Sequence, residues 1–104
     1  MTFTGNENHT ITLEEASKFT RNYREKAPSG AILGGYFGKE ALQRVLNQEN
    51  CVGIRYYHAE KDDGTSVLIL VGVDASENDL IGGELLEWSI PCPPYCGSAN
   101  QLNS

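Results

Sequence analysis

The residues best suited to chemistry in this sequence are three cysteines and one histidine. Cys92 and Cys96 stand four positions apart in the run Cys-Pro-Pro-Tyr-Cys, and Cys51 and His58 lie earlier in the chain. Thiolate and imidazole are the ligands of structural zinc, and two nearby thiols can also close a disulfide. Structural zinc sites usually space their thiols as C-x(2)-C, so this spacing favours free thiols. A zinc site and a Cys92 to Cys96 disulfide stay open as alternatives.

Two further patterns are typical of ligand sites but lack a required residue. The run from Gly34 to Lys39 is similar to a phosphate-binding loop, yet Leu33 replaces its first glycine and Glu40 replaces its metal-binding hydroxyl. The oxygen-bearing residues between Asp74 and Asp79 lack the glycine and glutamate of a calcium loop, and they indicate a solvated turn.

Motifs of enzyme active sites are absent from the sequence. It contains no nucleophile elbow, zinc-protease helix or dinucleotide fingerprint. A lone histidine in a strand, such as His58, is more often structural than catalytic. We therefore predict no catalytic residue and no cofactor, and the sequence favours a protein that is not an enzyme.

Composition narrows the class of partner. The chain has 104 residues, 39% of them hydrophobic and 21% charged, as in ordinary globular domains. Its 14 acidic and 8 basic residues give a net charge of -6, which repels phosphate groups. We therefore expect a soluble protein that binds neither nucleic acid nor membranes.

The terminal segment and the cysteine content bear on location. The first residues show no basic and apolar leader pattern, and the longest apolar run, Val67 to Val73, is too short to span a bilayer. Three cysteines do not make the disulfide framework of a small secreted domain. These features predict a cytoplasmic protein.

The first half of the chain predicts two helices. Residues 1–10 are polar and aperiodic and predict a flexible tail, which leaves a single α+β domain over residues 11–104. Thr12 and Glu15 form a capping box, and an apolar stripe follows at helical spacing up to Pro28: Leu13, Ala16, Phe19 and Tyr23. A second helical pattern runs from Gly38 to about Asn50.

The second half predicts an antiparallel sheet. The run 51–59 carries Val52, Ile54 and Tyr56 on one face, the run 66–74 is rich in Val, Ile and Leu, and the Asp-Gly step between them is typical of a hairpin. The second run is apolar on both faces, so we expect it to be covered on both sides or central. A third strand follows at Leu85 to Ile90, and then an irregular proline-rich arm. The predicted fold is two N-terminal helices packed on this small sheet.

Aromatic residues give the sequence its candidate binding surface. Rings left on the face or edge of a sheet often contact a partner, and the candidates are Tyr56, Tyr57, Trp88 and Tyr95. The favoured hypothesis is a non-enzymatic binding or assembly module, with a homodimer as its simplest form. The alternative is a metal-binding or thiol-redox protein that uses Cys51, His58, Cys92 and Cys96.

Seven short motifs follow one another through the chain: Thr12 to Glu15, Phe37 to Glu40, Leu46 to Gln48, Cys51 to Tyr57, Val71 to Asp74, Cys92 to Cys96 and Asn100 to Asn103. Together they resemble a family of small acidic bacterial hypothetical proteins with a C-terminal Cys-Pro-x-x-Cys-like arm. The resemblance begins near Ile11 and implies that this arm and the Val-Gly-Val-Asp strand end are recurring parts. The family has no assigned function, so the resemblance transfers no activity.

Overall fold

The computed structural model describes residues 1–87 and 89–104 and divides them into two compact units. Unit 1 comprises Met1–Glu7 and Phe37–Ser89, and unit 2 comprises Asn8–Tyr36 and Ile90–Ser104. Unit 1 thus includes residues 1–7, which are part of the predicted tail at residues 1–10.

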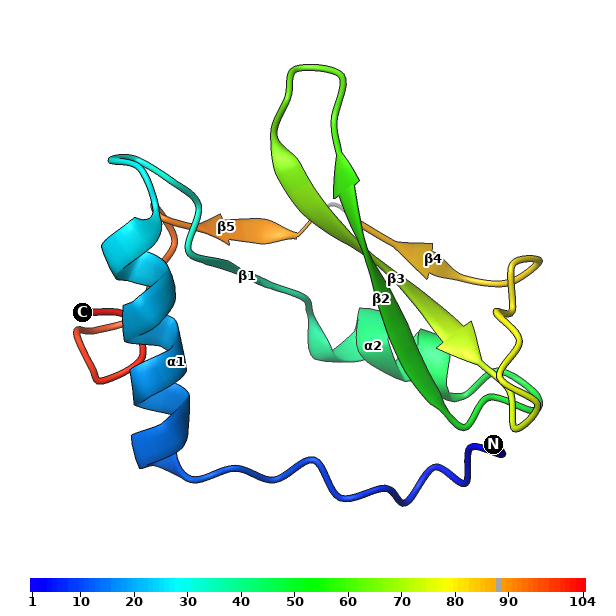
Figure 1. Cartoon of the computed structure of the whole chain (residues 1–104). Helices are drawn as coiled ribbons and strands as arrows, with labels where there is room; N and C mark the ends of the chain where they lie inside the picture. The colour runs from blue at the N-terminus through cyan, green and yellow to red at the C-terminus, as the bar shows by residue number, and fades with distance from the viewer. Residues whose placement is uncertain (88) are drawn as a thin grey trace. The chain divides into compact units, whose positions relative to one another are not determined.

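The elements make a mixed α+β fold with antiparallel sheets, as the sequence predicts. In chain order they are α1 (Leu13–Lys26), β1 (Gly34–Tyr36), α2 (Lys39–Leu46), β2 (Gly53–Glu60), β3 (Ser66–Val73), β4 (Leu85–Leu86) and β5 (Ile90–Cys92) (Figure 1). Neither helix of the described residues has the length and hydropathy needed to cross a membrane.

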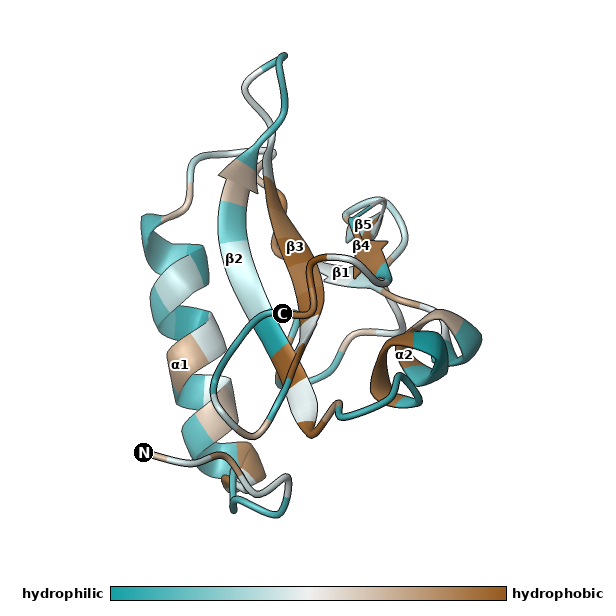
Figure 2. Ribbon diagram, turned by 90° about the vertical axis from the view of Figure 1, so that its right-hand side faces the viewer, coloured by the Kyte–Doolittle hydropathy of each residue, from teal (hydrophilic) through white to brown (hydrophobic). Residues whose placement is uncertain are grey.

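The hairpin of β2 and β3 is the main element of unit 1 and confirms the prediction. Its register pairs Gly53 with Val73 and Glu60 with Ser66. At the tip Gly64 has a φ of 89°, a conformation that glycine adopts without strain. The strand order β2-β3-β4 makes β3 central. Figure 2 shows β3 as hydrophobic along most of its length and β2 as mixed, as expected for a central and an edge strand.

Four hydrophobic side chains are buried in the part of the chain that the structure describes, and all belong to unit 1: Val45, Leu70, Val71 and Val73. Leu70 and Val71 point to opposite faces of β3, so both faces of this strand are covered, as predicted. Val45 comes from α2, which contacts β2 and β3. The predicted apolar side of this helix also included Leu46, which is exposed.

Gln48 joins the end of α2 to the turn before β4. Its Nε2 donates to the carbonyl of Val45 at 2.8 Å, and its Oε1 accepts from the amide of Glu84 at 2.9 Å. A Cβ on Gly72 would lie 2.8 Å from Nε2, and a Cβ on Gly83 would overlap Oε1. Because these two glycines have no side chain, the Gln48 amide can occupy the space beside them.

The predicted third strand at Leu85 to Ile90 is wrong as a single element. β4 pairs with β3, whereas β5 pairs with β1 in a separate two-stranded sheet of unit 2, where Gly34 faces Cys92. Proline lacks an amide hydrogen and is confined to short or edge strands. Because β5 contains Pro91, it can form only a short ladder, here against β1. The arm is therefore a strand at its start and turns from residue 93 onward.

The helix α1 has the predicted ends. The Thr12 hydroxyl oxygen accepts a hydrogen bond from the amide of Glu15 at 3.1 Å. The same hydroxyl donates to the Glu15 carboxylate at 3.3 Å. The helix ends at Lys26, two residues before Pro28, which cannot extend it.

Of the two predicted helices, α2 packs on the three-stranded sheet as expected, because it contacts β2 and β3. α1 belongs to unit 2, while the three-stranded sheet and α2 form unit 1. No residue of α1 is buried, and Leu13, Phe19 and Tyr23 are 54%, 56% and 57% exposed. Within unit 2 the apolar stripe of α1 is therefore not covered, and the half-buried side of the helix is the neighbouring one that carries Thr20 and Arg24.

Candidate functional site

The structure joins Cys92 and Cys96 by a disulfide, with their Cα atoms 4.8 Å apart. A backbone hydrogen bond of 3.0 Å from the amide of Tyr95 to the carbonyl of Pro91 bends the chain between them. This bend brings the two Cα atoms into the range that a disulfide requires. The preference for free thiols is therefore wrong for this pair. It holds for Cys51, whose thiol donates to the carbonyl of Gly53 at 3.2 Å.

The four candidate metal ligands do not form a cluster within either unit. Cys51 and His58 belong to unit 1, whereas Cys92 and Cys96 belong to unit 2 and are bonded to each other. Sulfur in a disulfide is not the thiolate that binds zinc. Across residues 1–87 and 89–104, no group of three or more His, Cys, Asp or Glu side chains is arranged to hold a metal ion.

The aromatic candidates lie on different surfaces. Side chains alternate along a strand, so Tyr56 and Tyr57 point to opposite faces of β2. The Tyr56 ring stands edge-on to the ring of His58 at 5.6 Å, and both side chains are exposed. Tyr95 is 70% exposed and belongs to unit 2, and Trp88 lies outside the described residues. Tyr56 and Tyr57 therefore cannot contact a partner through one face of the sheet.

A polar cluster in unit 1 involves Tyr57 in a different role. The hydroxyl of Tyr57 donates to Oδ2 of Asp79 at 2.5 Å, and Nη1 of Arg55 donates to Oδ1 at 2.6 Å. Arg55 also donates to the carbonyl of Glu77 at 3.1 Å, and its guanidinium lies 5.8 Å from the centre of the Phe3 ring. Hence β2 is fastened to the turn that follows β3.

The charges of this cluster stabilise one another. The hydrogen bond from Tyr57, followed by that from Arg55, lowers the pKa of the Asp79 carboxyl. The bond to Asp79 raises the pKa of the Tyr57 hydroxyl, because the neutral phenol is the donor. The same carboxylate raises the pKa of Arg55. The cluster thus holds an ionised carboxylate whose two oxygens are both occupied, which suits fastening better than catalysis.

The turn that carries Asp79 has its own hydrogen bonds, as the solvated-turn prediction requires. Oδ1 of Asp74 accepts from the amides of Ser76 and Asn78 at 2.9 Å each. Glu77 has a φ of 72°, and its amide donates to the carbonyl of Asp74 at 3.0 Å. The Asp74 carboxylate therefore caps this turn.

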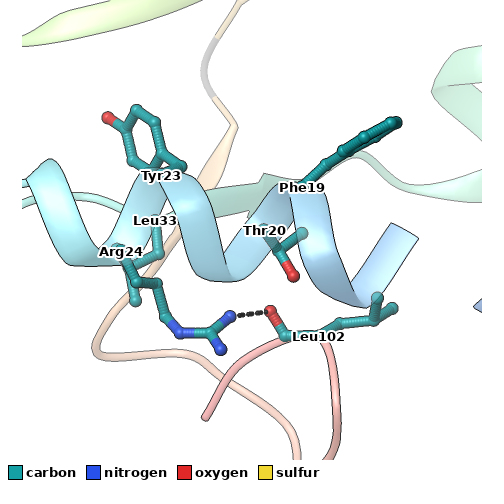
Figure 3. A pocket seen from close by; sticks show the side chains of 6 residues that line it. All are labelled: Phe19, Thr20, Tyr23, Arg24, Leu33 and Leu102. Atoms are coloured by element: carbon teal, nitrogen blue, oxygen red, sulfur yellow. Dashed lines mark hydrogen bonds between the residues drawn. The ribbon is translucent and has the colours of Figure 1, made fainter. Parts of the chain in front are cut away.

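Unit 2 contains an apolar pocket that the sequence did not predict. It has a volume of about 230 Å³ and is lined by Phe19, Thr20, Tyr23, Arg24, Leu33 and Leu102 (Figure 3). Nη1 of Arg24 donates to the carbonyl of Leu102 at 2.7 Å, which holds the C-terminal segment against α1. In Figure 3 the rings of Phe19 and Tyr23 point the same way from α1, away from Leu102. Two aromatic rings therefore stand at the edge of the pocket.

The sequence indicates the polar cluster and the pocket only in part. Alternation along β2 places Arg55 and Tyr57 on one face, but nothing in the sequence selects Asp79 among 14 acidic residues as their shared partner. The period of α1 identifies its apolar stripe but does not show that Leu102, far along the chain, lies beside it.

No protein-family model, curated protein or solved structure matches this chain.

Proposed function

We propose that this protein is a non-enzymatic assembly module that binds a second copy of itself. The observation that carries the proposal is the exposed apolar surface of unit 2, whose large side chains are Leu13, Phe19, Tyr23, Leu33 and Leu102. None of the side chains of unit 2 is buried.

The energetics of burial support a partner. Removing a Leu or Phe side chain from water contributes roughly 1.5–3 kcal/mol, and these side chains, which are 38% to 57% exposed, leave about half of this contribution unused. Contiguous exposed apolar surface on a small protein commonly marks an interface. The disulfide and the β1–β5 ladder constrain the backbone of unit 2 but leave each of these side chains at least 38% exposed.

The charge of the chain supports a protein as the partner. A net charge of -6 disfavours nucleic acid and anionic lipid headgroups. A second copy presents the same apolar side chains, so each copy would bury the surface of the other.

Sedimentation velocity from about 1 to 500 μM tests this proposal, a range that spans micromolar affinities. We expect a species of twice 11.4 kDa to appear with rising concentration. The melting temperature should rise with concentration as well, because association stabilises the folded state. A single monomeric species over the whole range, with a constant melting temperature, would refute self-association.

The disulfide favours a second candidate function, thiol-disulfide exchange at Cys92 and Cys96. An external dithiol would break the sulfur-sulfur bond, yield two thiols and become a disulfide itself, so two electrons and two protons move. Equilibration in glutathione buffers measures the reduction potential. A value between roughly -270 and -120 mV is typical of exchange proteins, and a value below about -300 mV indicates a structural bond.

We also propose a cytoplasmic location. The low number of cysteines supports it. The Cys92–Cys96 disulfide argues against it, because disulfides are rare in that compartment. Trapping of thiols in intact producing cells decides the point, since a cytoplasmic protein should yield Cys92 and Cys96 in the reduced form.

A further inference from the structure

One line of exposed residues on α1 is self-complementary. Glu15, Phe19, Tyr23 and Lys26 are spaced by four, four and three positions, so they follow one another along the same side of the helix. All four are exposed. The line therefore begins with an acid, continues with two rings and ends with a base.

The charges at the two ends of α1 favour antiparallel pairing. The first turn is acidic, with Glu14 and Glu15, and the last turn is basic, with Arg24 and Lys26. In an antiparallel pair the acidic end of each helix meets the basic end of the other, and the helix dipoles are opposed as well. A parallel pair would place like charges together at both ends.

The spacing along the helix allows one symmetry axis to serve both kinds of contact. The midpoint between Glu15 and Lys26 and the midpoint between Phe19 and Tyr23 differ by only about half a residue, which is less than 1 Å at 1.5 Å per residue. A two-fold axis near residue 21 therefore places Phe19 of one copy opposite Tyr23 of the other, and Glu15 opposite Lys26. Because of the symmetry, each of these contacts occurs twice.

We infer that α1 is the self-association surface and that it pairs antiparallel with α1 of a second copy. This inference rests on the proposed function and specifies its interface. Phe19 of each copy packs on Tyr23 of the other, and the two ion pairs flank this aromatic centre.

The area of the rings sets the extent of the interface. A ring that is about half exposed offers roughly 100 Å², so the four rings of a dimer contribute roughly 400 Å². A specific interface buries about 1,200 Å² or more. Exposed residues beyond the rings must therefore take part in the interface, and Leu33 at the pocket is one of them.

The first test is Phe19→Glu, measured by sedimentation against the matched control Leu85→Glu. Leu85 is exposed to a similar extent, 53%, but belongs to β4. We expect Phe19→Glu to raise the dimer dissociation constant at least about 100-fold, because the ring is lost twice in a symmetric dimer. Leu85→Glu should leave the constant unchanged.

The outcomes separate this inference from the proposed function. If the wild type dimerises and Phe19→Glu dimerises equally well, the α1 interface is wrong and the proposed function stands. If the wild type stays monomeric and Phe19→Glu lowers its melting temperature, α1 is covered by its own chain and both proposals fail.

The second test determines the direction of pairing by charge reversal. For an antiparallel pair, Glu15→Lys and Lys26→Glu should each weaken dimerisation about 3- to 10-fold, and an equimolar mixture of the two variants should restore it. For a parallel pair, neither variant alone would weaken dimerisation, and the mixture would bind more tightly than the wild type. Circular dichroism checks the helix in each variant, and Glu15→Gln controls for the capping box.

Discussion

Unit 1 and unit 2 differ in what holds them together. Unit 1 encloses Val45, Leu70, Val71 and Val73, and adds the Asp79 cluster at one edge. Unit 2 has no buried side chain, and its described links are the β1–β5 ladder, the disulfide and the bond from Arg24 to the carbonyl of Leu102. One unit is stabilised mainly by burial, and the other mainly by a few specific links between its segments.

The difference shows that regular structure and a buried core are separate properties. A capped helix such as α1 makes its interior backbone hydrogen bonds within itself, so it can form with its apolar side exposed. A central strand such as β3 has neighbours on both edges, and its apolar residues on both faces require cover on both. Substitution in unit 1 should therefore change folding stability, and substitution on α1 should change association.

The largest effect is expected for Val45→Asp in the core of unit 1. The side chain is fully buried, so an aspartate there would be an unpaired buried charge and should cost more than about 3 kcal/mol in unfolding free energy. Urea denaturation followed by circular dichroism measures the loss. The exposed counterpart Phe19→Asp should stay within about 0.5 kcal/mol of the wild type in dilute solution. Equal losses in both variants would contradict the distinction between the two units.

A smaller effect is expected for Gly72→Ala. The new methyl group would lie 2.8 Å from Nε2 of Gln48 and 3.1 Å from Sγ of Cys51. Such overpacking typically costs about 1–3 kcal/mol. Gly53→Ala is the matched control in the partner strand, because no atom lies within 4 Å of its new methyl group. Urea midpoints that fall equally in both variants would show that loss of glycine itself, and not contact with Gln48, is responsible.

The smallest effect is the pH dependence of the Asp79 cluster. The folded-state pKa of Asp79 is lowered, so its contribution is present above the ordinary carboxyl pKa of about 4 and is lost as pH falls through the lower folded value. The pKa of Tyr57 is raised, so its contribution is present below about pH 10 and is lost as pH rises further. Urea midpoints of the wild type and Asp79→Asn should therefore converge at both pH extremes, and a constant difference would contradict the role of Asp79.

Local chemistry predicts much of this fold. Three local signals each act within a few residues: the capping box at Thr12, the proline at position 28 and the turn at Gly64. The helix and the hairpin that these signals delimit occur where the sequence places them. The separation of β4 from β5 is different, because it depends on which distant strand each one meets. Two short extended runs close together in sequence do not reveal that they belong to different sheets.

The candidate site was harder to predict for the same reason. Exposure of Tyr56 and Tyr95 agrees with the expectation of surface rings, but Tyr57 is engaged by Asp79, 22 residues away. The stripe on α1 has the spacing of a core-facing helix, and only its surroundings distinguish a core from a surface. Periodicity shows that a side of a helix is apolar and does not show what covers it.

The position of Asp79 also limits how β2 can slide along β3. Arg55 and Tyr57 are two residues apart and reach the two oxygens of one carboxylate. A slip of one residue would turn both side chains to the opposite face of the sheet, and a slip of two would carry them about 6.6 Å along the strand. A single acidic residue outside the hairpin therefore discriminates against misaligned hairpins, which apolar contacts along β3 alone would tolerate more readily.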